Sequence, residues 1–563
     1  MSRRRFPAGL PHEEMLMNMR GCFLAALVVF PLQLSAATLI HNVRGYTLHD
    51  GERLSFTALE YDKGVVTAIY DDAASASASK AAERIDGQGL TLLPGLIDAH
   101  GHVAGLGSAL ASVDLTGSDS EGEAVARLSA VAENGEAWLF GAGWNQVLWP
   151  SGEFPSKTSL DAVITDRPVA LSRVDRHALW VNSKALSLAG ITADTPDPAG
   201  GQIVRDDAGE PTGILIDNAM RLIAEALPEA TVESKKRDLS RAMRYLVSLG
   251  MTGAHDAGST ALEVDAYDAL LKDGEFPMRI YSMLRMADPL IEKKWLEGPR
   301  KSTGGLFELR SVKISADGAL GSRGAALFED YSDDPGNKGL LLLSDEELSR
   351  QISRSAELGY QVNVHAIGDR ANAKVLDEFE ALNASSGQRA LRHRVEHAQI
   401  LRPVDIQRFA ELDVIASVQP THATSDKNMA GTRLGEDRLE GAYAWQSLFE
   451  SGAKLAGGSD FPVEPPNPFF GLHAAVTRQD RDGEPPGGWR VGEALSRNKA
   501  LSLFTEDAAY SGHAETQVGR LLPGYAADFI LVRDDFFAVP REQLWKNKVH
   551  ATVVAGELVF GEL

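Results

Sequence analysis

Strand-like and helix-like segments alternate through the middle of the chain, and this alternation restricts the fold more than any other feature. Between residues 250 and 459, short runs rich in β-branched residues alternate with amphipathic patterns such as Asp345–Leu358 and Ala371–Leu382. Units of this kind build a parallel sheet, and this many of them suit a closed (β/α)8 barrel. The strand-like runs include Ser311–Ser315, Gln361–His365, Arg394–His397 and Val414–Val418.

Segments outside this alternation predict two further parts of an α/β fold. β-like runs occur at both ends of the chain, and chain ends that lie close together can pair into one sheet. We therefore expect a small β-sandwich domain from residues 38–93 and 515–563, and a TIM-like barrel from residues 94–514. From about residue 107 to residue 250, clusters of Gly, Pro and Asp interrupt the alternation. This interruption predicts an inserted subdomain over one face of the barrel.

Residues 1–37 have the pattern of a signal peptide. Arg20 ends a basic region, residues 23–34 are apolar, and Ala36 and Ala37 are small enough for cleavage. The apolar run is short for a bilayer span, so we expect export to the periplasm or the medium and no stable membrane span after cleavage. A buried N-terminal helix is the alternative. The only cysteine, Cys22, lies in this segment, so metal ligands in the mature chain would be His, carboxylates or a modified Lys.

The chain is acidic, with a formal net charge of -22 at pH 7. Nucleic acids and anionic lipids are polyanions, and no long run of Lys and Arg offsets the repulsion. Small molecules are therefore the expected partners. A homodimer is the common default for such a chain, and the sequence does not decide it.

Two histidines, His100 and His102, follow an apolar strand-like run. Residues two apart on a strand share a face, so both imidazoles could reach one cation, and Gly101 between them leaves room for a close approach. A pair of structural histidines at a strand end is the alternative.

Other strand-like runs also end in polar residues that can bind a metal. His365, His397 and Asp460 each close or follow such a run. Barrel active sites collect side chains from the C-terminal ends of several strands, so these residues would converge. A single histidine is more often a structural residue than a ligand, but the recurrence predicts a centre with one or two divalent ions, and zinc suits these ligands.

Lys313 would point into the barrel from the middle of a strand. An unpaired ammonium there costs several kcal/mol, and neighbouring cations would increase the cost. Carboxylation by CO2 would convert the amine into an anionic carbamate that can bridge two metals. The alternative is a lysine paired with Asp317 or another acid.

Several segments carry these residues in a combination that resembles the amidohydrolase superfamily, and within it the family 3 group of YtcJ-like proteins and N-substituted formamide deformylases. The resemblance extends from about residue 38 to the C-terminus. The segments are Pro94–His102, Gly143–Asn145, Val174–Asn182, Lys313 with Ala316–Arg323, Val364–Asp369, Glu396–Gln399 and Gly458–Val463.

The resemblance implies a role for each ligand and for the whole chain. His100 and His102 would bind one metal together with Asp460, His365 and His397 would bind a second, and carboxylated Lys313 would bridge the two. The chain would be a metal-dependent hydrolase of a C–N bond, in an amide, N-acyl or N-formyl group of a small molecule. Asp460 would act as the catalytic acid and base by moving the proton of a metal-activated water.

Four residues are further candidates for the site. His177, in the inserted region, could reach the substrate or its oxyanion as a catalytic residue, or could stabilise a loop. Arg323 could bind a substrate carboxylate, or form a structural ion pair. Asp317 and Trp144 are also expected to contact the substrate, although Trp144 could equally belong to a core.

Two other functions remain open on the sequence. A deaminase of the same superfamily attacks an amidine carbon in a ring, and the lysine bridge argues modestly against it. A non-catalytic exported protein that binds metal or solute is a different class, and the candidate proton carrier argues against that one.

Overall fold

The computed structural model describes residues 37–130, 138–174, 177–386 and 388–563. The predicted signal peptide lies outside the described residues except for Ala37. No helix in the described part of the chain combines the length and the apolar character needed to cross a membrane.

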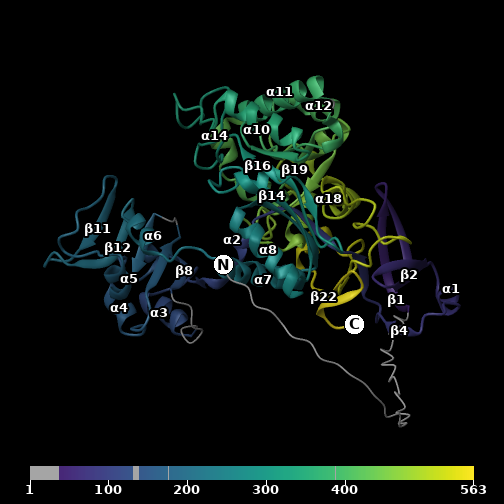
Figure 1. The fold of residues 1–563 in the computed structure, drawn as a ribbon, viewed down its shortest axis with the longest axis horizontal. Helices are drawn as coiled ribbons and strands as arrows, with labels where there is room; N and C mark the ends of the chain where they lie inside the picture. Colours follow the sequence, from purple (N-terminus) through teal and green to yellow (C-terminus); the bar gives the residue numbers. More distant parts are fainter. Residues whose placement is uncertain (1–36, 131–137, 175–176, 387) are drawn as a thin grey trace, which may run out of the picture.

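A parallel barrel forms the centre of the molecule (Figure 1). Its strands are hydrogen-bonded in the order β20-β19-β18-β17-β16-β14-β13-β6, and a parallel bridge between Gly101 and Phe461 brings the two edges together. The predicted (β/α)8 architecture is confirmed. The strands are β6 (Leu96–Gly101), β13 (Met251–Ser259), β14 (Arg279–Arg285), β16 (Phe307–Ser315), β17 (Gln361–Ala366), β18 (Arg394–His397), β19 (Ile415–Val418) and β20 (Leu455–Gly457), with β15 (Arg300–Lys301) paired to β16.

Helices surround this barrel because their apolar stripes need a partner. In α7 (Val232–Ser248) the buried side chains Leu239, Met243 and Leu246 recur at helical spacing, and a capping box at Thr231 fixes the N-terminus. The other helices of the barrel region are α2 (Val103–Ala111), α8 (Ala261–Asp273), α9 (Glu292–Leu296), α10 (Asp345–Glu357), α11 (Asp369–Ser386), α12 (Pro403–Leu412), α13 (Pro420–Asp426), α14 (Ala430–Leu434), α15 (Trp445–Glu450), α16 (Pro468–Thr477), α17 (Arg497–Leu503) and α18 (Glu506–Ser511).

The two ends of the chain share one sheet, of order β23-β22-β21-β5-β1-β2-β3 with β4 beside β1. β21 from the C-terminal part pairs antiparallel with β5 from the N-terminal part, and Figure 1 shows β1 and β2 on the same side of the barrel as β22. The elements are β1 (Thr38–His49), β2 (Glu52–Asp62), β3 (Val65–Tyr70), α1 (Ala73–Ser77), β4 (Glu83–Asp86), β5 (Thr91–Pro94), β21 (Phe529–Val532), β22 (Val549–Val554) and β23 (Glu557–Gly561).

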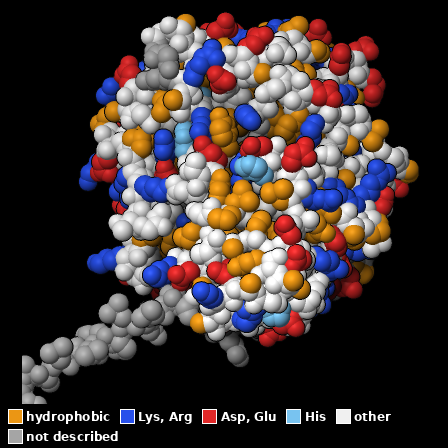
Figure 2. All heavy atoms as spheres, turned by 90° about the vertical axis from the view of Figure 1, so that its right-hand side faces the viewer, with side chains coloured by type: hydrophobic (Ala, Val, Ile, Leu, Met, Phe, Trp, Pro, Cys, Tyr) orange, Lys and Arg blue, Asp and Glu red, His pale blue; other side chains and the backbone are white. Residues whose placement is uncertain are grey.

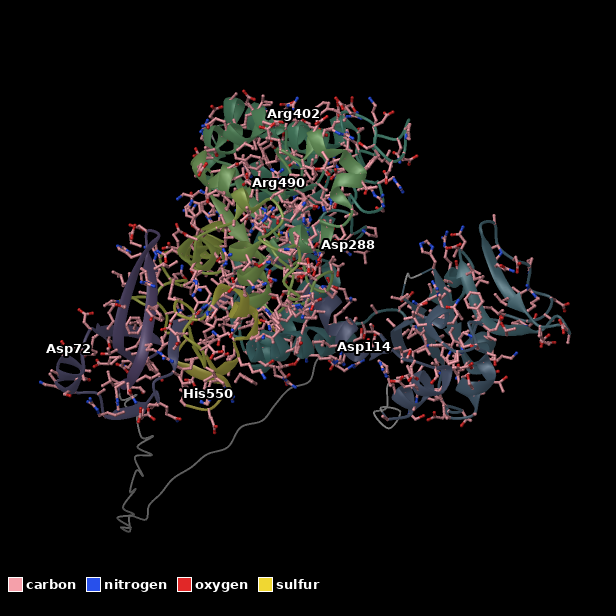
Figure 3. The ribbon with its side chains drawn as sticks, turned by 180° about the vertical axis from the view of Figure 1, so that it is seen from behind. Asp72, Asp114, Asp288, Arg402, Arg490 and His550 are labelled. Carbon is pink, nitrogen blue, oxygen red and sulfur yellow. The ribbon has the colours of Figure 1, made fainter. Side chains whose placement is uncertain are left out.

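A third sheet, of order β11-β12-β10-β9-β8-β7, lies to one side of the barrel in Figures 1 and 3. Figure 3 places Asp114, the last residue of β7, at the junction between this inserted sheet and the barrel. The insertion is therefore present, but it lies beside the barrel instead of covering one of its faces. Its elements are β7 (Val113–Asp114), α3 (Glu121–Ser129), β8 (Leu139–Trp144), α4 (Lys157–Asp161), β9 (Val169–Arg173), β10 (Ala178–Val181), α5 (Ser183–Leu188), β11 (Gly201–Arg205), β12 (Pro211–Asp217) and α6 (Met220–Ala226).

The inserted sheet has a hydrophobic core of its own, separate from that of the barrel. The predicted insertion of residues 107–250 is longer than this unit, because α7 contributes buried side chains to the barrel core instead.

Acidic and basic side chains are interspersed over the face of the molecule shown in Figure 2. That face therefore does not form the continuous basic surface that nucleic acid binding requires.

Candidate metal centre

Polar side chains from several barrel strands meet at the C-terminal ends of those strands. A cavity of about 700 Å³ opens there. All the residues predicted as metal ligands lie at this end of the barrel, together with a histidine that was not predicted. They are His100 on β6, His102 directly after it, Lys313 on β16, His365 on β17, His397 on β18, His422 on α13 and Asp460 after β20.

The predicted pair, His100 and His102, lies against one oxygen of Asp460. Asp460 Oδ1 is 3.5 Å from His100 Nε2 and 3.1 Å from His102 Nε2. Ligand atoms of the three residues all lie within 4.8 Å of one another, so one ion could contact all three. A Cβ at Gly101 would lie 2.2 Å from the ring of Phe461, so only glycine fits between the two histidines.

His397, His422 and Asp460 form a second group with the same spacing. His422 Nε2 lies 3.7 Å from Asp460 Oδ2, and the His397 and His422 rings stack with their centroids 5.9 Å apart. His397 Nδ1 lies 2.7 Å from Gln419 Oε1, which can accept a hydrogen bond from Nδ1–H and so leave Nε2 available to an ion. His422 follows the strand-like run Val414–Val418, so the strand-end reasoning applied elsewhere could have identified it.

A buried carboxylate, Glu396, orients His100. Glu396 accepts a hydrogen bond from His100 Nδ1 and forms an ion pair with Arg394, whose Nε lies 2.8 Å from Oε1. Burial alone would raise the pKa of Glu396, but the charge of Arg394 and the hydrogen bond from His100 hold that pKa well below its ordinary value. The proton on Nδ1 is thereby fixed, and Nε2 of His100 faces the cavity end of the barrel as a ligand.

Two further predicted ligands, Lys313 and His365, line the cavity. The amine Nζ of Lys313 lies 3.2 Å from His100 Nε2, and burial lowers the pKa of Lys313. Burial also lowers the pKa of His100 to about 4 and the pKa of His365 to about 3. Both imidazoles are therefore neutral at pH 7, which is the form that binds metals.

Asp460 is held in place by the backbone. Its N–H donates to the carbonyl oxygen of His100 at 2.7 Å, and its φ of 61° lies in the left-handed region, as does the φ of 78° at His397. Such strain in residues other than glycine is concentrated at functional sites. Burial would raise the pKa of Asp460, but the hydrogen bond with His102 and the nearby histidines hold it well below its ordinary value. Asp460 is therefore ionised at neutral pH.

The donor atoms of the centre fit divalent metal ions. Among the described residues, His365 Nε2 and His422 Nε2 are buried without a hydrogen-bond partner. Each buried polar atom left unpaired costs about 1–3 kcal/mol. Two such nitrogens in one cavity therefore indicate a site that a bound ligand completes. Imidazole nitrogens and a carboxylate are the donors that zinc and similar ions take in proteins.

The structure places the two inserted-region candidates away from the cavity. Trp144 is fully buried in the core of the inserted sheet, where its ring nitrogen donates to the carbonyl oxygen of Leu171 at 2.8 Å. His177 Nδ1 is bonded to Asp217 Oδ1 at 2.7 Å, and 74% of its side chain is exposed. Neither residue lines the cavity, because the inserted sheet lies beside the barrel.

Arg323 and Asp317 also have other partners. Arg323 forms a two-point ion pair with Asp333, with N···O distances of 3.1 and 2.9 Å. It therefore forms a structural ion pair, which was the alternative to binding a substrate carboxylate. Asp317 accepts hydrogen bonds from the backbone of Ala326, Ile367 and Gly368 and anchors two loops beside His365. Neither residue lines the cavity, and Asp317 does not pair with Lys313 in this structure.

Residues 83–560 match the profile of the amidohydrolase family. The chain belongs to the amidohydrolase family. It is 36% identical to the YtcJ protein of Bacillus subtilis strain 168 over 524 residues, which cover 91% of this chain and 97% of YtcJ. It is 28% identical to the N-substituted formamide deformylase of Arthrobacter pascens over 504 residues, which cover 86% of this chain and 91% of the deformylase.

Two similar solved structures have the same fold. An uncharacterized metal-dependent hydrolase from Pyrococcus furiosus is 30% identical, with a TM-score of 0.75 over 89% of this chain and 99% of that one. A second, from Pyrococcus horikoshii, is 28% identical with the same TM-score over 90% of this chain. The protein is therefore an enzyme of the amidohydrolase family with a site for divalent metal.

Proposed function

We propose that the protein hydrolyses a C–N bond in an amide, N-acyl or N-formyl group of a small molecule. The observation that carries this proposal is the position of Asp460, which contributes an oxygen to each of the two histidine groups. Asp460 is thus shared by both groups of possible metal ligands. The similarity to an N-substituted formamide deformylase makes N-formyl compounds the first substrates to test.

The residues of the chain would have two roles, metal binding and proton transfer. His100 and His102 with Asp460, and His397 and His422 with Asp460, would hold the metal. When bound, divalent ions supply charge that polarises a carbonyl and lowers the pKa of a water molecule to about 7. Asp460 is ionised and buried, so it can take a proton from that water and return it to the departing amine.

We also propose that Lys313 is carboxylated and that the metal is zinc. The lowered pKa of Lys313 leaves more of its amine neutral, and the neutral amine is the form that combines with CO2. A carbamate there would present oxygens beside His100 and His365. Lys313→Ala should lose metal and activity, and short carboxylic acids should restore part of both. Unchanged metal content and turnover in the variant would rule out the bridge.

The test of the reaction class combines metal analysis with a substrate panel. Purified protein loaded with zinc is assayed for amine and formate release from N-formyl and N-acyl compounds, and for ammonia release from nucleobases. Asp460→Asn should lower turnover by about 10²–10⁴-fold, the range of general acid–base catalysis. A variant that keeps its metal and near-normal turnover would contradict the assigned role. Ammonia release alone would indicate a deaminase, and a metal-loaded protein inert on the whole panel would indicate a binding protein.

Export of the protein is a separate proposal, supported by the basic and apolar pattern of residues 1–37. Fractionation of cells that express the full chain, with N-terminal sequencing of the product, tests it. A product that retains residues 1–37 in the cytosol would contradict it.

A further inference from the structure

The walls of the cavity combine apolar side chains with very few cations. The apolar residues include Met286, Leu320, Leu342 and Met429. Lys313 and Arg285 are the only Lys or Arg side chains among the described residues that line it. Because the chain as a whole carries a net charge of -22, an anionic ligand would be repelled unless a local cation received it.

Arg285 lies beside the metal centre because of the register of the barrel. It is the last residue of β14 and pairs with Lys313 on β16, so the two side chains leave adjacent strands at the same level. Adjacent strands are about 4.8 Å apart. A Cβ built on Gly258, at the end of β13, would be 3.5 Å from Arg285 Nε and 4.0 Å from Lys313 Cγ. Both side chains therefore flank the same glycine.

The guanidinium of Arg285 has no hydrogen bond, ion pair or ring contact with any residue that the structure describes. The acids of the same cavity differ in this respect. Asp426 Oδ2 accepts hydrogen bonds from Gln399 Nε2 and Tyr443 OH, each at 2.7 Å, and Glu464 accepts one from Ser425. Arg285 therefore presents a solvent-exposed guanidinium without a partner among the described residues at the wall of the cavity that Lys313 also lines.

We propose that Arg285 binds a carboxylate of the substrate, so that the preferred substrates are N-formyl or N-acyl derivatives of amino acids with apolar side chains. This inference rests on the proposed C–N hydrolysis. An arginine binds a carboxylate with two parallel hydrogen bonds, which fixes orientation as well as position. The carboxylate at Arg285 and the scissile carbonyl at the centre would hold the substrate at two points, while the apolar wall receives its side chain.

A matched pair of substrates tests the proposal. N-formylleucine, as both enantiomers, and N-(3-methylbutyl)formamide share the formyl group and the isobutyl chain, and only the first has a carboxylate. Both release formate, so one assay measures both. The parent enzyme should have the higher kcat/KM for one enantiomer of N-formylleucine. Arg285→Gln should raise KM for that substrate by about 10–100-fold, the range expected for a hydrogen-bonded charge, and leave the neutral formamide within twofold.

Two variants serve as controls. Arg285→Lys keeps the positive charge but loses the pair of parallel hydrogen bonds, and it should retain part of the preference for N-formylleucine. Arg244→Gln removes an exposed arginine of α7 and should change neither substrate. If Arg285→Gln slows both substrates equally or loses metal, the residue supports the centre itself and the inference is overturned. Equal kcat/KM values of the parent enzyme for the two substrates would also overturn it.

A binding measurement separates failure of this inference from failure of the proposed reaction. If neither formamide is cleaved, the proposed reaction fails for this class, and calorimetry with 4-methylpentanoate still probes Arg285. Binding that weakens about 10-fold or more in Arg285→Gln, but not in Arg244→Gln, would support the carboxylate site. Absent binding, or equal binding by all three proteins, would overturn it.

Discussion

At the scale of single residues, His422 gives the clearest prediction about the centre. His422 Nε2 is buried, has no hydrogen-bond partner among the described residues, and lies 3.7 Å from Asp460. His422→Gln should therefore weaken retention of metal by at least about 10-fold and lower turnover. Even the replacement of a residue that only supports a metal ligand typically lowers metal affinity or activity by about 10–100-fold. Metal analysis after dialysis against a series of chelator concentrations measures the effect.

The exposed His49 provides the control for this substitution. His49→Gln lies in the sheet formed by the chain ends and should leave metal content unchanged. If His422→Gln retains as much metal as His49→Gln does, then His422 is not a ligand, and only His397 and Asp460 remain of the second group.

Strand-end reasoning predicted that these side chains converge, because in a parallel barrel the C-terminal ends of all strands meet at one end. His100, His365, His397 and Asp460 each end or follow a strand, so the register alone brings them together. His422 was not predicted because it lies on α13, the helix that follows β19, and not at the end of the strand itself. Arg285 escaped notice because an arginine that ends a strand is usually a surface residue, and the sequence does not show whether it has a partner.

At the scale of secondary-structure elements, the connection into β18 contains a histidine that must stay neutral. Val362 N–H donates to His393 Nδ1 at 3.1 Å, which requires an unprotonated nitrogen, and the ring stacks on Phe379 of α11. Burial lowers the pKa of His393 to about 4. In the unfolded chain His393 binds a proton near pH 6.5. Its contribution to the free energy of unfolding is therefore fully present above pH 6.5 and is lost as the pH falls towards 4.

His393→Asn keeps an acceptor but removes this titration. Urea unfolding between pH 7.5 and pH 4.5 should show a smaller loss of stability in the variant, by up to roughly 3 kcal/mol at the acidic end. The comparison between proteins is needed because burial raises the pKa of Asp98 and Asp317 to about 7, which acts in the opposite direction. Identical pH profiles for the parent and the variant would contradict the prediction.

The inserted sheet should unfold without taking the metal centre with it, because its core is separate from the barrel core. Trp144→Ala leaves a large cavity in that core and should cost about 3–5 kcal/mol in the stability of the insertion. An early unfolding step in proteolysis or fluorescence, with unchanged metal content, is the expected result. Loss of metal together with this step would show that the insertion supports the centre.

The position of the insertion could not be predicted from the sequence for a related reason. The Gly, Pro and Asp clusters indicate where the alternation stops, but nothing local specifies how a separate core is placed against the barrel. His177 and Trp144 were predicted as site residues from segments that resemble the family, yet the structure places them on this separate unit. Similarly, α7 is amphipathic in a way that suits either core, and only its packing assigns it to the barrel.

At the scale of the whole molecule, function and stability occupy opposite ends of the barrel. The metal centre lies at the C-terminal ends of the strands, whereas Arg279 begins β14 at the other end. Arg279 pairs with Asp528 of the chain-end sheet, with Nε 2.6 Å from Oδ2, and Asp528 also accepts a hydrogen bond from the backbone of Ala555. This pair therefore joins the barrel to the sheet that contains both chain ends.

Asp528→Asn should destabilise the whole protein without changing its catalysis. The substitution leaves the largely buried guanidinium of Arg279 without its counter-charge, and breaking such a pair costs roughly 3–5 kcal/mol. Urea unfolding should shift to lower concentration, while kcat and metal content at 25 °C stay at the parent values because the centre lies at the other end of the barrel. The exposed Asp534, replaced by Asn, is the control and should change stability by less than about 0.5 kcal/mol. A fall in kcat of folded Asp528→Asn would mean that the two ends of the barrel are coupled.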